Sequence, residues 1–219
     1  MDDLLRDGKD NLAMQALAPL SRTYLPWSGY AMRPSGVVKV LNEMVINQRS
    51  VVVECGAGLT TFYIAGLIQQ QGKGHLYTIE HDPEWIAVVR GLLVQGGLES
   101  YVTLIHAPLV DCELSLEGTA WYDRAVIAQV MGDRAIDLLV VDGPPAYDLA
   151  RQYARYPAAI YFQSQFAPDF AIVLDDIDRL GEQHILAQWQ EKIPGLAVKQ
   201  LAIDGGVAIC SNRSGFSVS

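Results

Sequence analysis

Cysteine is scarce in this sequence. The three cysteines, Cys55, Cys112 and Cys210, stand far apart and form no CxxC or other spacing typical of a metal site. A disulfide framework needs an even number of closely spaced cysteines, so the sequence predicts a reducing compartment. The first residues are acidic where a signal peptide is basic. We therefore expect a cytoplasmic protein.

Basic residues and long apolar runs are also lacking. Lysine and arginine number 16 against 25 aspartates and glutamates, which gives a formal net charge of −9. This balance argues against nucleic-acid phosphates or an anionic membrane surface as the main partner. No uninterrupted apolar run reaches the roughly 18 residues of a membrane span, so we expect no membrane segment.

The residues that are present suffice for a sizeable core. The chain has 219 residues, of which 50% are hydrophobic and 19% charged. This composition suits one larger domain, or a domain with a short extra lobe. The sequence pattern changes near residue 50. We expect a helical N-terminal extension over residues 1–49 and the main domain over residues 50–219.

From residue 50 onward, short apolar runs alternate with helical patterns. The runs at 51–53 and 136–141 are continuous, as in strands buried on both faces. Asp82-Pro83 is typical of a helix start and Gly96-Gly97 of a helix end. Repeated strand–helix units predict an α/β fold with a Rossmann-like, doubly wound and mostly parallel sheet. Expected strands cover residues 51–53, 76–79, 101–105, 136–141 and 170–174, and expected helices cover about 34–45, 62–68, 82–95, 123–131, part of 149–166, and 180–192.

The C-terminal part breaks this alternation. Two apolar runs at 196–203 and 207–211 are separated only by Asp204-Gly205-Gly206, which is typical of a hairpin turn. The last strand should therefore run antiparallel to its neighbour. Such a C-terminal hairpin distinguishes the expected fold from a plain dinucleotide-binding domain.

A glycine-rich turn follows the first expected strand and opens a helix. Gly56 and Gly58 allow the backbone to turn tightly and to approach a ligand closely. The amides at the helix start suit a carboxylate or a phosphate. Glu80 ends the second expected strand beside this turn, where it can accept both hydroxyls of a ribose. The alternative is that Glu80 only caps or solvates the strand end.

NAD and S-adenosylmethionine both carry an adenosine that fits such a turn. A dinucleotide site favours a third glycine or alanine where this chain has Thr61. An acid at position 54 repels a pyrophosphate but attracts the ammonium and sulfonium groups of S-adenosylmethionine. The antiparallel hairpin also favours the methyl donor.

These motifs resemble those of class I S-adenosylmethionine-dependent methyltransferases. Residues 51–58 (VVVECGAG) look like the first motif of that family, and residues 77–80 (YTIE) look like its ribose-binding strand end. Residues 136–145 and 171–176 are similar to its fourth and fifth strands with the acids that follow. The resemblance spans roughly residues 35–212 and implies S-adenosyl-L-methionine as the cofactor. The implied cofactor-binding residues are Glu54, Gly56, Ala57 and Gly58 at the methionine part, Glu80 at the ribose, His81 near the adenine, and also Thr60 and Asp142. Residues 106–109 (HAPL) depart from the family's frequent Gly-Asp-Ala, which leaves the adenine contact there open.

Acidic residues end the fourth and fifth expected strands. Asp142, Asp175 and Asp176 should meet in one crevice, because ligands bind outside the carboxyl ends of such strands. Asp142 and Asp175 are the expected catalytic residues. Three carboxylates also suit Mg²⁺, which would orient an acceptor hydroxyl and lower its pKa. This pattern is similar to catechol-type, metal-dependent O-methyltransferases, except that Asp176 stands where they carry Asn.

Other interpretations of the same acids stay open. Asp142-Gly143-Pro144-Pro145 is good turn chemistry, and Asp175, Asp176 or Asp178 can cap the next helix. Asp142 can also contact the cofactor or substrate without a metal. The same segment is similar to the (Asp/Asn)-Pro-Pro-(Tyr/Phe) motif of amino-directed methyltransferases, but it has an extra glycine and Ala146 instead of the aromatic.

Aromatic residues are dense before the first strand. In similar enzymes such a segment covers the cofactor and forms part of the substrate pocket, whereas a satellite core is the structural alternative. The residues concerned are Tyr24, Trp27, Ser28, Tyr30 and Met32. His106 and Tyr147 are further candidates for a general base.

The sequence thus predicts S-adenosylmethionine-dependent methyl transfer to a small molecule, at a hydroxyl oxygen. An NAD-dependent oxidoreductase and a non-catalytic domain that keeps the fold are the alternatives. The sequence also leaves a homodimer open.

Overall fold

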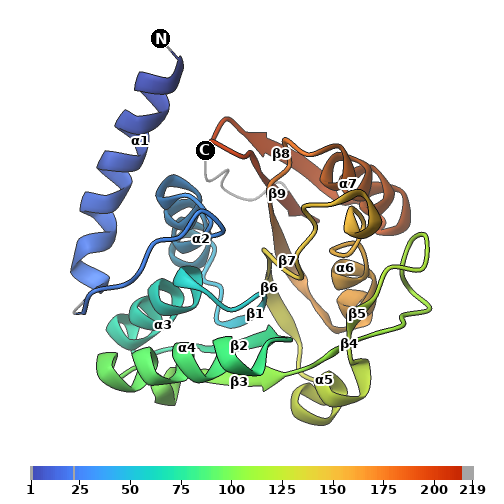
Figure 1. The fold of residues 1–219 in the computed structure, drawn as a ribbon, viewed down its shortest axis with the longest axis horizontal. Helices are drawn as coiled ribbons and strands as arrows, with labels where there is room; N and C mark the ends of the chain where they lie inside the picture. The colour runs from blue at the N-terminus through green and yellow to red at the C-terminus, as the bar shows by residue number, and fades with distance from the viewer. Residues whose placement is uncertain (1, 22, 214–219) are drawn as a thin grey trace.

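The computed structural model describes residues 2–21 and 23–213. Met1 and residues 214–219, the outer ends of the two expected units, lie outside the described residues. Seven strands form one sheet in the order β3-β2-β1-β6-β7-β9-β8 (Figure 1). They are β1 (Val51–Cys55), β2 (His75–Glu80), β3 (Val102–His106), β6 (Ile136–Val141), β7 (Phe166–Asp175), β8 (Ala197–Leu201) and β9 (Val207–Ser211).

Helices cover both faces of this sheet. They are α1 (Asp2–Leu17), α2 (Pro34–Ile46), α3 (Leu59–Gln71), α4 (Pro83–Gly96), α5 (Arg124–Met131), α6 (Pro157–Phe162) and α7 (Leu180–Lys192). Helices α2, α3 and α4 pack on one face, and α5, α6 and α7 pack on the other (Figure 1). The predicted doubly wound α/β fold is confirmed.

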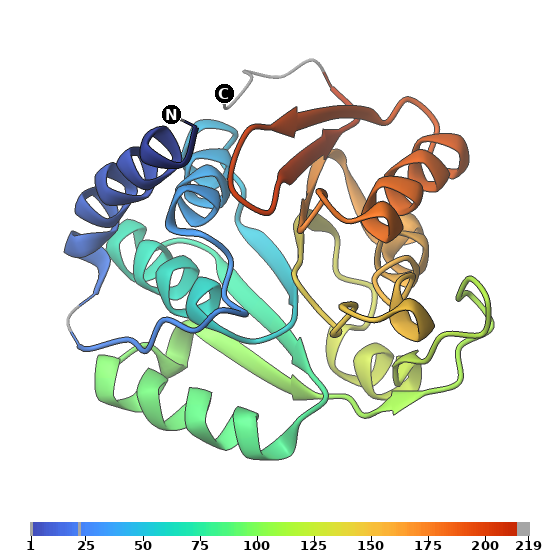
Figure 2. The ribbon, with the colours of Figure 1, turned by 45° about the horizontal axis from the view of Figure 1, so that its top comes forward.

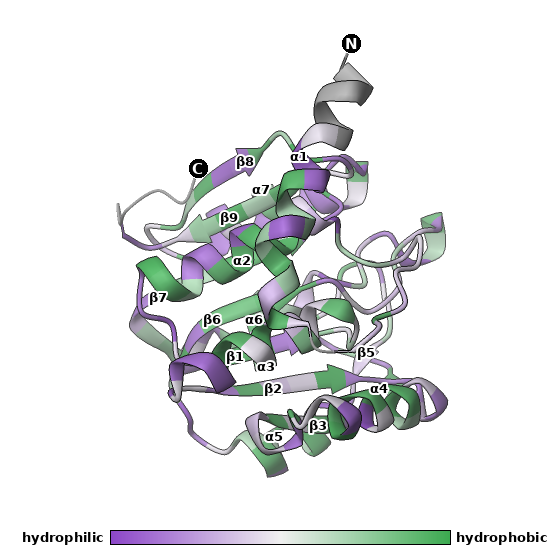
Figure 3. Ribbon diagram, turned by 90° about the vertical axis from the view of Figure 1, so that its left-hand side faces the viewer, coloured by the Kyte–Doolittle hydropathy of each residue, from purple (hydrophilic) through white to green (hydrophobic). Residues whose placement is uncertain are grey.

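The alternation of side chains along each strand creates the two cores. Val52 and Leu138 point into the core under α2 and α3, whereas their neighbours Val53 and Leu139 point into the opposite core. Both positions are apolar because a central strand is buried on its two faces. Figure 3 shows hydrophobic residues along β6 and bands of both colours around α4, which has only one buried face.

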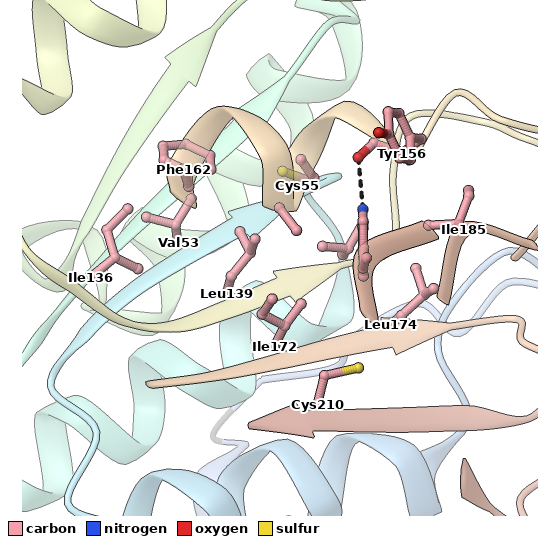
Figure 4. Packing of buried hydrophobic residues seen from close by; sticks show 14 of the residues in the cluster. Val53, Cys55, Ile136, Leu139, Tyr156, Phe162, Ile172, Leu174, Ile185 and Cys210 are labelled. Carbon is pink, nitrogen blue, oxygen red and sulfur yellow. Dashed lines mark hydrogen bonds between the residues drawn. The ribbon is translucent and has the colours of Figure 1, made fainter. Parts of the chain in front are cut away.

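The second core anchors the segment that leads into α6. Figure 4 shows Tyr156 and Phe162 above Val53 and Leu139 of the sheet. The indole Nε1 of Trp189 donates a hydrogen bond of 2.9 Å to the carbonyl of Tyr156. This contact ties α7 to the residues immediately before α6, so that the segment 153–157 has a fixed place over the sheet.

Local sequence signals set several element ends. Asp82 caps α4 by accepting hydrogen bonds from the amides of Glu84 and Trp85, and Gly97 ends that helix with a φ of 64°. The hairpin prediction is also confirmed, because β9 pairs antiparallel with both β8 and β7. Figure 2 shows β8 and β9 as neighbouring red strands at the edge of the sheet.

Two features differ from the expected elements. Strand β7 begins at Phe166 and not at residue 170, because its first residues continue as an extended chain that contacts Ile136 across a register shift. A small second sheet of β4 (Leu109–Val110) and β5 (Trp121–Tyr122) was not expected. Two-residue strands are too short to show an alternating pattern.

The strand order places a crevice at the carboxyl end of β1. The chain leaves β1 toward β2 and β3 on one side, whereas β6 lies on its other side. Such a reversal of strand order opens a space outside the carboxyl ends of the two central strands. In the described part of the chain, no helix has the length and apolarity to span a membrane.

Candidate active site

A cavity of about 520 Å³ opens at the carboxyl ends of β1, β2, β6 and β7. Its volume lies in the range of small-molecule and cofactor sites. Much of its lining comes from the glycine turn with the end of β2, from the acidic ends of β6 and β7, and from the segment before α2, and further lining residues come from α4, β5 and the segment before α6. The lining includes Ser28, Tyr30, Met32, Gly56, Ala57, Gly58, Thr60, Glu80, His81, Trp85, Tyr122, Asp142, Tyr147, Arg155, Asp175, Asp176 and Arg179.

The glycine turn is shaped by close backbone contact. Gly56 has a φ of +93°, and a Cβ there would lie 3.0 Å from the Cα and N of Gly143. The turn after β1 therefore packs directly against the turn after β6. At Gly58 a Cβ would meet no protein atom within 4 Å. Gly58 thus leaves open space on the cavity side at the start of α3.

The carboxylate of Glu80 is fixed beside this turn. Its Oε2 accepts a hydrogen bond of 3.1 Å from the amide of Ala57. Its Oε1 accepts hydrogen bonds from the amides of His81 and Asp82, at 2.7 and 2.9 Å. Glu80 is buried and still lines the cavity. Three backbone amides therefore hold this carboxylate beside the glycine turn, and its contact with a ribose stays a prediction.

Glu54 lies beneath the turn and outside the cavity lining. Its Oε2 accepts hydrogen bonds from the hydroxyls of Thr61, at 2.6 Å, and Thr78, at 2.8 Å. Burial raises the pKa of Glu54 to about 8. Burial therefore favours the uncharged form of this carboxyl, which weakens the attraction for a sulfonium that we expected. Its contact with the cofactor stays a prediction.

Thr61 connects Glu54 to the turn. The amide of Gly58 donates a hydrogen bond of 3.0 Å to the hydroxyl of Thr61, which in turn donates to Glu54. Thr61 occupies the position where a dinucleotide site favours glycine or alanine. Its hydroxyl instead accepts a hydrogen bond from the Gly58 amide, which caps the start of α3.

The three acids at the ends of β6 and β7 meet in the crevice. One carboxylate oxygen from each of Asp142, Asp175 and Asp176 lies within 4.8 Å of the others. Burial is the main cause that raises the pKa of Asp142, and the charge of Asp175 adds to it. No side chain caps the start of α7, so these acids do not serve the capping role that stood as an alternative.

Arg155, which no sequence pattern indicated as a site residue, lies against this acidic cluster. Its Nη2 is 3.3 Å from Oδ1 of Asp142, and its Nη1 is 3.0 Å from Oδ2 of Asp176. Only 4% of its side chain is exposed. No periodicity or motif singled out Arg155, because it precedes α6 in a stretch of turns.

Aromatic residues surround the mouth of the cavity. The rings of Tyr30 and Tyr147 lie 6.5 Å apart, and the guanidinium of Arg151 lies 4.7 Å from the centre of the Tyr147 ring. On the opposite side, Nε1 of Trp85 donates a hydrogen bond of 2.7 Å to the carbonyl of Ala57. The segment before α2 thus contributes to the cavity wall, through Ser28, Tyr30 and Met32.

Other aromatic and basic candidates lie outside the cavity lining. Tyr24 is exposed, whereas Trp27 packs on Tyr63 with ring centres 6.2 Å apart. Nε2 of His106 lies 3.2 Å from the carbonyl of His81, and His106 is not part of the lining. Tyr147 lines the cavity and is the one of these two general-base candidates that faces it.

Comparison with known proteins gives a family match and several solved structures with the same fold. A family model described as "Methyltransferase domain" matches residues 53–177, which include the glycine turn, Glu80 and the three acids. No curated protein matches the sequence. Solved structures share the fold at low identity. A methyltransferase from Geobacter sulfurreducens is 17% identical, with a TM-score of 0.58 over 94% of this chain and 88% of that one.

Two further solved structures contain a ligand. The O-methyltransferase TomG from Streptomyces achromogenes, in complex with SAM, is 16% identical with a TM-score of 0.54, covering 92% of this chain and 88% of that one. An O-methyltransferase from Bacillus cereus, in complex with SAH, is also 16% identical, with a TM-score of 0.55 over 94% and 91% of the two chains.

Proposed function

Because the chain belongs to the methyltransferase domain family, we propose that it transfers the methyl group of S-adenosyl-L-methionine to a hydroxyl oxygen of a small molecule. The observation that carries the proposal is the position of the Glu80 carboxylate, held by three backbone amides beside the Gly56 turn. The family match does not favour the NAD-dependent oxidoreductase alternative. Two solved structures of the same fold that hold SAM or SAH support the choice of cofactor.

The cavity suits the cofactor at three points. Glu80 presents its carboxylate to two ribose hydroxyls, and charge-assisted hydrogen bonds of this kind contribute about 1.5–3 kcal/mol each. The open space at Gly58 lets the backbone at the start of α3 approach the amino-acid part, whose carboxylate a helix N-terminus favours. When bound, S-adenosylmethionine supplies a methyl group activated by its sulfonium charge. His81 and Trp85 line the same side and are the proposed neighbours of the adenine.

Asp142 and Asp175 are the proposed catalytic residues, with Asp175 as the proton acceptor, because burial raises the pKa of Asp142 and favours its protonated form. Both line the cavity on the side opposite Glu80, at the ends of β6 and β7. An acceptor hydroxyl in contact with them would give its proton to the Asp175 carboxylate while its oxygen takes the methyl group, and the methyl–sulfur bond would break to leave S-adenosylhomocysteine. Burial, and next the charge of Asp176, raises the pKa of Asp175 to about 6, which suits proton transfer near neutral pH.

The shape of the remaining cavity supports a small, partly apolar acceptor. Tyr30, Tyr147 and Pro144 form an apolar wall next to the acids. Tyr30 and Tyr147 are exposed at the mouth and contact each other. A planar or apolar acceptor can pack between these rings while its hydroxyl reaches the carboxylates. The net charge of −9 does not favour nucleic acid or an anionic membrane surface as the substrate.

Mg²⁺ fits this site poorly. Carboxylate oxygens are suitable ligands, but Arg155 already donates a hydrogen bond to the carboxylate of Asp142 and forms an ion pair with that of Asp176. Nη1 of Arg179 also lies 2.9 Å from Oδ2 of Asp176. The buried Arg155 guanidinium, which reaches both Asp142 and Asp176, therefore occupies the position where a metal would supply positive charge, whereas the half-exposed Arg179 pairs with Asp176 alone among the three acids. We assign no step to a metal ion.

A binding experiment tests the proposed function. Glu80→Ala should weaken the affinity for S-adenosylhomocysteine by about 100-fold, because the ribose loses two charge-assisted hydrogen bonds. Isothermal titration calorimetry measures this difference directly. Glu84→Ala, which removes an exposed carboxylate one turn away, is the matched control and should bind like the wild type. Equal affinities of Glu80→Ala and the wild type would refute the ribose assignment.

A further inference from the structure

Arg155 has the surroundings of a permanent structural cation. Its guanidinium has five N–H donors, and the structure offers five acceptor contacts. Nε points to the carbonyl of Pro144, at 3.4 Å, and Nη1 to the carbonyl of Asp175, at 3.2 Å. Nη2 donates to the carbonyl of Asp142, at 3.1 Å. The two carboxylates of Asp142 and Asp176 complete the set.

These contacts leave Arg155 little freedom to move or to lose its charge. Three of the five acceptors are backbone carbonyls at the ends of β6 and β7 and in the turn after β6, and these groups do not titrate. An arginine side chain stays protonated at all ordinary pH values. The hydrogen bonds of Arg155 go to Pro144, Asp175 and Asp142, and its remaining close contact is the ion pair with Asp176, so these protein groups engage most of its N–H donors. It is a positioning residue and not a catalytic one.

A further acidic side chain, that of Glu182, lies close to the Arg155 guanidinium. Glu182, in the first turn of α7, is fully buried, and its Oε1 lies 3.8 Å from Nη1 of Arg155. The same oxygen lies 3.8 Å from Nη1 of Arg179. The guanidinium of Arg155 therefore has three acidic side chains around it: Asp142 near Nη2, and Asp176 and Glu182 near Nη1. Moving it away would remove one of the two guanidinium groups near the buried Glu182 carboxyl, which is unfavourable.

A divalent cation competes directly with this arrangement. An ion bound to one oxygen of each of Asp142, Asp175 and Asp176 would lie about 2.1 Å from each oxygen. The fixed guanidinium would then stand within a few ångströms of it, and the two positive charges would repel each other in a buried environment. We propose that the Arg155 guanidinium takes the place of a divalent metal ion in this site, so that binding and methyl transfer need no metal.

This inference rests on the proposed function for the reaction, but not for its binding test. In the wild type, Arg155 holds Asp142 and Asp176 in position and balances part of their charge. Removing the guanidinium alone should leave the three carboxylates as a vacant cation site. We therefore expect a variant without the Arg155 guanidinium to gain an affinity for divalent ions that the wild type lacks.

The test uses Mn²⁺ as the probe, because its electron paramagnetic resonance signal decreases on binding. Arg155→Met should bind Mn²⁺ at least about 100-fold more tightly than the wild type, since the repulsion disappears while the ligands remain. Mn²⁺ and Mg²⁺ should also raise the melting temperature of Arg155→Met and leave that of the wild type unchanged. A purely structural role for Arg155 would lower the melting temperature without creating ion affinity.

Three further variants make the result specific. Arg155→Lys keeps the positive charge and should not bind Mn²⁺. Arg179→Met also removes one arginine charge, but from a residue whose ion pairs are with Asp176 and Glu182 only, and it should not bind Mn²⁺ because Arg155 stays in place. Asp175→Asn in the Arg155→Met background should abolish the new affinity.

Measurements on the wild-type protein test the proposal even if the Arg155→Met variant does not fold. Tight Mn²⁺ binding by the wild type, or loss of methyl transfer in EDTA with recovery on adding Mg²⁺, would overturn the proposal. Failure of the proposed function has a different signature. In that case the wild type would not bind S-adenosylhomocysteine in EDTA, whatever its behaviour toward Mn²⁺.

Discussion

Glu54 offers a sharp test of the electrostatics beneath the glycine turn. Its side chain is fully buried, and its Oε2 accepts hydrogen bonds from Thr61 and Thr78. Its Oε1 is buried and has no hydrogen-bond partner among the described residues. Such a carboxyl is favoured in its neutral form, because an ionised oxygen without a partner is costly to bury. Glu54→Gln replaces it with a neutral group of the same shape.

The magnitude follows from the two pKa values. The carboxyl titrates near 4.5 in the unfolded chain, and burial raises its pKa to about 8 in the folded protein. Between these values the folded state holds a proton that the unfolded state has lost, so the stability of the wild type falls as the pH rises. The slope is about 1.4 kcal/mol per pH unit, which amounts to about 3 to 4 kcal/mol between pH 5 and pH 8.

The variant should lack this slope. Urea unfolding at pH 5, 6, 7 and 8 measures the free energy of unfolding of both proteins. We expect the wild type to be the more stable at pH 5, because the side-chain amide introduced by Glu54→Gln adds one unpaired donor at a cost of about 1–3 kcal/mol. At pH 8 the order should reverse.

Glu99→Gln, on an exposed carboxylate, controls for the change in net charge. A stability difference between Glu54→Gln and the wild type that stays constant from pH 5 to pH 8 would refute the reasoning. In that case the Glu54 carboxyl would be ionised in the folded protein, and its charge would have a partner that the hydrogen bonds to Thr61 and Thr78 do not account for.

Two other substitutions address the turn and the acids. Gly56→Ala should lower stability by about 1–3 kcal/mol and abolish S-adenosylhomocysteine binding, because its Cβ collides with Gly143 at 3.0 Å. Calorimetry measures the binding. Gly72→Ala, at a position with a positive φ but open space, is the control and should still bind S-adenosylhomocysteine. For Asp175, whose pKa is raised to about 6 by burial and by Asp176, the wild-type kcat/KM should rise with pH through about 6. Asp175→Asn should lose this rise and about 10²–10⁴ of the rate; a variant that keeps the wild-type pH profile would exclude Asp175 as the base.

The features that the sequence predicted well depend on neighbours along the chain. Asp82-Pro83 and Gly97 begin and end α4 because capping and left-handed glycine conformations involve residues only a few positions apart. The Asp204-Gly205-Gly206 turn predicts the hairpin for the same reason. Strand β6 is evident from its composition, since a strand buried on both faces has few polar positions to interrupt it.

The features that it missed depend on contacts between distant segments. The sequence indicates a charged acid at Glu54 that attracts the cofactor, but Thr78 on the neighbouring strand and Thr61 on α3 donate hydrogen bonds to this buried carboxyl. The β4–β5 pair is visible only when residues 109–110 and 121–122 meet. Nothing near Arg155 in the sequence indicates that the ends of two strands surround it.

The sequence by itself therefore determined the alternation of strands and helices and the sharp turn at Gly56. It also determined that acids stand at the ends of β2, β6 and β7, namely Glu80, Asp142 and Asp175. These features depend on backbone propensities and burial patterns, which act locally. Only the tertiary structure decided what charge those acids carry. Burial in a low-dielectric core raises the pKa of Glu54, and the packing of α6 and α7 places the Arg155 guanidinium among Asp142, Asp176 and Glu182. Ionisation and charge balance depend on which groups are within a few ångströms, and spacing along the chain does not contain that information.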